Sequence, residues 1–169
     1  TNSAFCTDSG CGEEMSGLGW EKIRRDRMGN LRGRFGRGKT AVALDGHADT
    51  VGPGYLSNWS CDPYRGRYER GWIWGRGTVD QKGGLAAAVY ALPAIRELGL
   101  LGDYSLHLVA SVQEEGSEGL SWDHIIDEDG FRPDLVVLTE PSDLKIMRGQ
   151  KGRAEIIVTA RGVTAHASR

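Results

Sequence analysis

Three apolar runs, each followed closely by an acid or a histidine, constrain the fold of this 169-residue chain most strongly. The runs cover residues 40–44, 104–112 and 135–138, and turn-forming residues bound each of them. Continuous apolar runs of this length are typical of strands buried on both faces, as in parallel sheets. The segments 83–98 and 120–128 lie between them and have helical patterns. The sequence therefore predicts an α/β fold with a mixed, largely parallel sheet flanked by helices.

The flanking segments have different patterns. Residues 21–35 are typical of short strands separated by turns, and WIWG at 72–75 indicates another short strand. Beyond Met147 the composition changes, and residues 153–160 alternate apolar and polar side chains like a strand with one exposed face. We expect residues 1–150 to form one unit and 151–169 to begin another.

Charge, hydropathy and cysteine content exclude several function classes. The formal net charge of −2 gives no bias towards nucleic acid, and no apolar stretch is long enough to cross a bilayer. Three cysteines cannot all pair, and no signal peptide is visible, so we expect a cytoplasmic protein. The sequence starts without Met and stops within a patterned segment, so we also expect it to be a fragment of a longer protein.

Residues 33–40, GRFGRGKT, match the phosphate-binding loop pattern G-x-x-x-x-G-K-[ST]. That loop binds phosphate only when a helix N-terminus follows it, because the helix amides hold the anion. Here the apolar strand over 40–44 follows instead. A glycine-rich hairpin is therefore the better interpretation, and nucleotide binding is the minor alternative.

Acids and one histidine lie where the predicted strands end or the first long helix begins: His47, Asp49, Asp80, Glu114, Glu115 and Glu140. Because the carboxyl ends of parallel strands meet at one edge of a sheet, these groups should converge in one crevice. Carboxylates that face one another disfavour ionisation unless a cation lies between them. One histidine with several carboxylates is the ligand set of zinc or a similar transition metal, with Co or Mn as alternatives.

Spacing suggests roles for several of these residues. Asp49 lies two residues from His47, so it leans the same way in an extended chain and can accept the second ring N–H. The surplus of acids favours two metals that share a carboxylate, for which Asp80 is the best candidate. Of Glu114 and Glu115, one can bind metal while the other takes a proton from a water activated there.

Each of these positions alone has an ordinary structural explanation, since strand-end acids frequently cap turns or helices. His107 and His124, inside a predicted strand and a predicted helix, are expected to be structural. A non-catalytic protein with the same fold, acting as a binding module, is the main alternative to a hydrolase. Its function would survive removal of metal by a chelator.

The motifs GHADTV, WIWGRGTVDQKGG, QEEGSEG, LTEPS and GVTAHAS follow one another between Glu21 and Arg169. This series resembles the co-catalytic zinc peptidase family that includes acetylornithine deacetylase, succinyl-diaminopimelate desuccinylase, aminoacylase and carboxypeptidase G. GRGTVDQKGG and IIDEDGFRPDLVVLTEP also resemble its selenium-metabolism-linked hydrolase branch.

The resemblance implies a zinc-dependent hydrolase of N-acyl amino acids or small peptides, with two zinc ions per full-length subunit. It implies that His47 and Glu140 bind one zinc, Glu115 binds the other and Asp80 bridges them. It further implies that Asp49 orients His47, that Glu114 is the general base, and that a cis peptide joins Asp80 to Gln81.

The resemblance also implies an organisation beyond the first sheet. Residues 1–150 would be the N-terminal part of the catalytic domain, and 151–169 would begin a lid domain through which full-length subunits form a homodimer. His166 would belong to this lid and stabilise the oxyanion in the partner's site. A second histidine ligand would lie further along the full-length protein. We therefore expect an incomplete second metal site, exposed apolar surface and little activity in the 169 residues alone.

Overall fold

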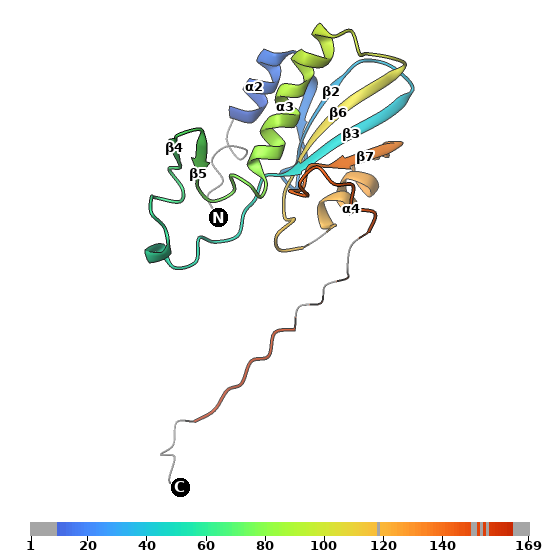
Figure 1. Cartoon of the computed structure of the whole chain (residues 1–169). Helices are drawn as coiled ribbons and strands as arrows, with labels where there is room; N and C mark the ends of the chain where they lie inside the picture. Colours follow the sequence, from blue (N-terminus) through green and yellow to red (C-terminus); the bar gives the residue numbers. More distant parts are fainter. Residues whose placement is uncertain (1–9, 118, 150–151, 153, 155, 164–169) are drawn as a thin grey trace.

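A five-stranded sheet is the centre of the computed structural model, which describes residues 10–117, 119–149, 152, 154 and 156–163 (Figure 1). β3 pairs in parallel with β6 and β7, whereas β2 pairs antiparallel with β6 and with β1, so the predicted mixed sheet is confirmed. In spatial order the strands are β1 (Glu21–Arg25), β2 (Leu31–Phe35), β6 (Tyr104–Ser111), β3 (Thr40–His47) and β7 (Leu135–Leu138).

Helices cover both faces of this sheet (Figure 1). α2 (Gly10–Leu18) and α3 (Lys82–Glu97) bury Met15, Leu85 and Leu92 against one face, where Leu106 and Leu108 of β6 join them. α4 (Leu120–Asp127) packs Ile125 on the other face, against Ala43 and Val109. Alternate residues of β6 thus face opposite layers, as burial on both sides of a strand requires.

A long connection between β3 and α3 carries its own small structure. It contains the 3₁₀ turn η1 (Leu56–Asn58) and a separate two-stranded hairpin of β4 (Arg67–Glu69) and β5 (Trp72–Trp74). β5 confirms the strand predicted near residues 72–75. The connection delivers the chain from the carboxyl end of β3 to the N-terminus of α3.

The glycine-rich segment 33–40 is not a hairpin, so this prediction was wrong. β2 and β3 lie on opposite sides of β6 and do not pair with each other. The connection instead crosses close to the start of β6, where a Cβ at Gly38 would lie 2.1 Å from the backbone nitrogen of Tyr104. Glycine is needed there for backbone approach. A strand follows the loop, as predicted, and not the helix that a phosphate-binding loop requires.

The strand predicted over 153–160 is also wrong for the residues described there. Residues 154 and 156–160 are exposed, belong to no strand and run away from the sheet (Figure 1). A strand needs ladder hydrogen bonds to a neighbour, and the described residues provide none for this segment. The strand over 135–138 is present as β7, but its residues are 36% to 59% exposed, so the prediction that this strand is buried on both faces was wrong. β7 is the edge strand of the sheet, and its exposure agrees with the expected exposed apolar surface.

Within the described part of the chain, no helix is both long and apolar enough to span a membrane. The boundary expected between residues 150 and 151 stays a prediction.

Candidate metal centre

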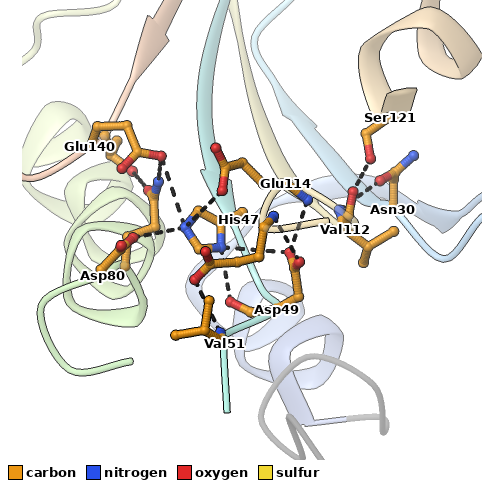
Figure 2. Close-up of polar contacts among 12 residues, drawn as sticks. Asn30, His47, Asp49, Val51, Asp80, Val112, Glu114, Ser121 and Glu140 are labelled. Atoms are coloured by element: carbon orange, nitrogen blue, oxygen red, sulfur yellow. Dashed lines mark hydrogen bonds and ion pairs between the residues drawn. The ribbon is translucent and has the colours of Figure 1, made fainter. Parts of the chain in front are cut away.

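The carboxyl ends of the three parallel strands bring the candidate ligands together (Figure 2). In the parallel register, His47 at the end of β3 lies opposite Ser111, directly before the turn that carries Glu114. Asp45 pairs with Leu138 of β7, two residues before Glu140. Asp80 comes from the N-terminus of α3. Since the three strands end and α3 begins at one edge of the sheet, residues far apart in sequence share one crevice.

Three carboxylates surround one nitrogen of the His47 imidazole (Figure 2). The distances from His47 Nε2 are 2.9 Å to Asp80 Oδ1, 3.8 Å to Glu114 Oε2 and 3.9 Å to Glu140 Oε1. The imidazole is 1% exposed, whereas these carboxylates are 40% to 54% exposed. Ligand atoms of His47, Asp80 and Glu140 all lie within 4.8 Å of one another, which is close enough for one metal ion to contact all three.

The other imidazole nitrogen faces Asp49. His47 Nδ1 lies 2.9 Å from the backbone oxygen of Asp49 and 3.5 Å from its Oδ1, so an N–H on Nδ1 donates to Asp49. Nε2 is thereby directed towards Asp80 and Glu140, as a metal-binding imidazole requires.

The charge balance of the site calls for a cation. Burial disfavours a charged His47 ring, but hydrogen bonds to Asp49 and Asp80 outweigh it and raise the pKa of His47 to about 10. Burial raises the pKa of Glu140. His47 lowers that pKa, whereas the carboxylates of Asp80 and Glu114 raise it further. A proton on His47 thus balances the acids, and a metal ion between the same atoms would do so more fully. The donor set fits a metal.

The turn that carries the two adjacent glutamates is held through its backbone (Figure 2). Asp49 accepts hydrogen bonds from the amides of Glu114, at 3.3 Å, and of Glu115, at 3.2 Å. Just before the turn, the Val112 amide donates to Asn30 Oδ1 at 2.9 Å, and the Val112 carbonyl accepts from the Ser121 hydroxyl. Asp49 therefore connects the histidine to the glutamate turn.

The candidates do not all converge. Glu115 Oε1 accepts from the Val51 amide at 3.1 Å, and Glu115 is not in the three-residue metal cluster found among the described residues. His166 lies outside the described residues. The cis peptide between Asp80 and Gln81 is present, as the resemblance implied. Asn30 and Gln81 are buried polar residues of the site that sequence reasoning missed.

Comparisons with known sequences agree with this geometry. The sequence profile of the peptidase family M20/M25/M40 matches residues 43–163. The uncharacterized protein YgeY of Escherichia coli (strain K12) is 48% identical over 156 residues, which cover 92% of this chain and 39% of YgeY. A probable succinyl-diaminopimelate desuccinylase of Staphylococcus aureus (strain Mu50) is 33% identical over 150 residues, covering 87% of this chain and 36% of that protein. The chain thus spans less than half the length of these relatives.

Solved structures show the same fold. The di-peptidase Dug1p of Saccharomyces cerevisiae superposes with a TM-score of 0.64 at 20% identity, over 77% of this chain and 32% of Dug1p. The M20 family metallo-carboxypeptidase Sso-CP2 of Sulfolobus solfataricus gives 0.63 at 19% identity, over 79% of this chain and 32% of Sso-CP2. Profile, relatives and fold agree: the chain belongs to the peptidase family M20/M25/M40.

Proposed function

We propose that the protein containing this chain is a metal-dependent hydrolase that cleaves an amide or peptide bond in an N-acyl amino acid or a small peptide. The observation that carries the proposal is the buried His47 Nε2 with three carboxylates within 4 Å. The relatives' names support the substrate class, because a desuccinylase and a di-peptidase both cleave amide bonds. The selenium-linked branch and a cytoplasmic location stay predictions.

His47, Asp80 and Glu140 would hold the first ion, for which zinc is the preferred candidate and Co or Mn are alternatives. Glu115 would hold a second ion bridged by Asp80, completed by a histidine beyond these 169 residues. A bound ion of this kind polarises a carbonyl group and makes water acidic enough to attack at neutral pH.

Glu114 is the proposed general base. Its carboxylate lies 3.8 Å from His47 Nε2, yet its backbone is fixed separately through Asp49. It would take one proton from the attacking water and give it to the nitrogen of the leaving amine as the C–N bond breaks. Asp49 would keep the His47 ring oriented while this proton moves.

The full-length protein would add the parts that these residues lack. We propose that residues 151–169 begin a lid domain that joins two subunits, with His166 stabilising the oxyanion in the partner's site. The exposed apolar residues of β7 are suited to burial by the remainder of the catalytic domain.

Substitution of the general base in the full-length protein tests the proposal. Glu114→Gln should keep its metal, measured by elemental analysis, and lose about 10²- to 10⁴-fold in kcat on N-acyl amino acids or dipeptides. Glu128→Gln, an exposed glutamate beyond α4, is the matched control and should keep full activity. Hydrolysis at the wild-type rate by Glu114→Gln would overturn Glu114 as the general base. Function that survives chelation, with no hydrolysis by the wild-type protein, would favour the binding module.

A further inference from the structure

Gln81 is a buried polar residue between the metal ligand Asp80 and the first residue of α3, and it is 1% exposed. Its Nε2 donates to Glu140 Oε1, and its Oε1 accepts from the Thr139 hydroxyl at 2.6 Å. We propose that Gln81 is a positioning residue that holds the Glu140 carboxylate at the metal centre and so raises the affinity for the ion. This inference rests on the proposed function.

The hydrogen bonds fix which way the Gln81 amide points. An amide has a donor end and an acceptor end, whereas an ionised carboxylate can only accept. The reversed amide would bring its oxygen against a Glu140 oxygen and leave that carboxylate without the donor. The NH₂ group therefore faces Glu140, and the amide oxygen faces the Thr139 hydroxyl. That hydroxyl has one proton and two acceptors, Gln81 Oε1 at 2.6 Å and the Asp45 carbonyl at 3.1 Å. The Asp45 carbonyl already accepts from the Thr139 amide at 2.8 Å, so the proton goes to Gln81.

Close packing restricts the Gln81 side chain. A Cβ at Gly46 would lie 2.8 Å from Thr139 Oγ1 and 2.9 Å from Gln81 Oε1, so a side chain there would disrupt the pair. A Cβ at Gly84 would lie 2.5 Å from the Thr139 carbonyl oxygen. β3, the end of β7 and α3 therefore meet closely around Gln81, with glycine at both contact points.

Charge explains why a neutral donor suits this position. Glu140 is 44% exposed and shares the crevice with Asp80 and Glu114, so repulsion favours rotation of its carboxylate towards solvent. A Lys or Arg donor would hold Glu140 but would also place a positive charge beside the ion. The amide of Gln81 holds the carboxylate without that competing charge.

Metal titration of this chain tests the inference. Zn²⁺ affinity would be measured by calorimetry, and Co²⁺ coordination by visible absorption, for wild type and for Gln81→Met, which keeps the volume but removes the donor. Loss of a hydrogen-bonding partner of a ligand typically costs about 10- to 100-fold in affinity, and we expect that loss with a changed Co²⁺ spectrum. Ser105→Ala is the matched control, because it removes a buried polar group at the opposite end of the sheet. It should leave the Zn²⁺ affinity and the Co²⁺ spectrum unchanged.

Thr139→Val gives an independent arm should Gln81→Met fail to fold, as judged by thermal unfolding without metal. It removes the hydroxyl that orients the amide and should weaken Zn²⁺ binding less than Gln81→Met does. If folded Gln81→Met keeps wild-type affinity and an unchanged Co²⁺ spectrum, the inference is overturned but the proposed function is not. If only Thr139→Val folds, the same result in that variant overturns the inference. A wild-type chain that binds neither ion would overturn this inference, and the proposed function would fall with it if the full-length protein also bound neither ion.

Discussion

Two buried histidines on neighbouring strands have opposite surroundings. His47 ends β3 at the carboxyl edge of the sheet, whereas His107 lies within β6, paired with Ala43 of β3. His47 is 1% exposed and His107 is 7% exposed, so both rings are nearly excluded from water. One faces carboxylates, while the other contacts the Phe131 ring, with centroids 4.6 Å apart, and Ser105.

Neighbouring charges, and not burial, separate the two rings. Burial lowers the pKa of both, but Asp49 and Asp80 reverse this for His47 and bring its pKa to about 10. Burial lowers the pKa of His107 to about 4, and the positive charges of Arg32 and Arg34 act in the same direction. A buried histidine thus becomes a candidate ligand only where the strand ends among acids.

The largest expected effect is loss of metal binding on removing the ligand ring. His47→Ala should weaken Zn²⁺ binding by more than about 100-fold, beyond the usual range for groups that only contact a ligand. Calorimetric titration of the chain measures this. His107→Phe, which keeps an aromatic ring against Phe131, is the matched control and should bind Zn²⁺ like wild type. Equal losses in both variants would mean that burial alone, and not position, determines their effect.

The positions of these two histidines relative to the strands could be predicted from the sequence. Apolar runs in the sequence predict strands. His47 follows one such run, whereas His107 lies inside another. The cluster of His47, Asp80 and Glu140 at one edge also follows, since parallel strands end together.

Contacts that depend on tertiary register could not be predicted. Asn30 meets Val112, and Gln81 meets Thr139, only because particular strands and helices lie side by side. Sheet order is equally non-local, because β6 comes between β2 and β3 from more than fifty residues away in sequence. Adjacent motifs such as 33–40 therefore suggested a hairpin that is not formed.

The second largest effect concerns Asp49, which accepts from Nδ1 of His47. By contrast, Nδ1 of His107 has no hydrogen-bond partner among the described residues. Asp49→Asn keeps the backbone carbonyl that lies 2.9 Å from Nδ1 but removes the carboxylate charge at 3.5 Å. It should therefore weaken Zn²⁺ binding about 10-fold, at the low end of the usual range for partners of a ligand. Asp62→Asn is the matched control, since Asp62 also accepts two successive amides, from Tyr64 and Arg65, but in an exposed turn. Calorimetry measures Zn²⁺ binding by both variants. Equal affinities would contradict the role of Asp49 in orienting His47.

A smaller effect is a pH-dependent loss of stability due to His107. Its folded pKa, about 4, lies below the unfolded value of 6.5, so the unfolded chain binds the proton more readily. The part of the unfolding free energy that depends on a neutral His107 is fully present above pH 6.5. It is lost as the pH drops towards 4, by about 1–2 kcal/mol after allowance for partial solvation. Urea unfolding at several pH values should show a flatter dependence in His107→Phe over this window. Parallel curves for the two proteins would assign the loss to other groups.

The smallest effect separates charge from burial at His107. Arg32 lies over the Phe131 ring at 4.1 Å, and its charge is a lesser cause of the low pKa than burial is. Arg32→Met keeps apolar packing on that ring and should raise the pKa of His107 by less than about one unit, as followed by NMR titration. Arg37→Met, in the exposed turn after β2, should leave that pKa unchanged. If Arg32→Met alone restored the pKa to 6.5, the charge of Arg32, and not burial, would be the main cause of the low pKa of His107.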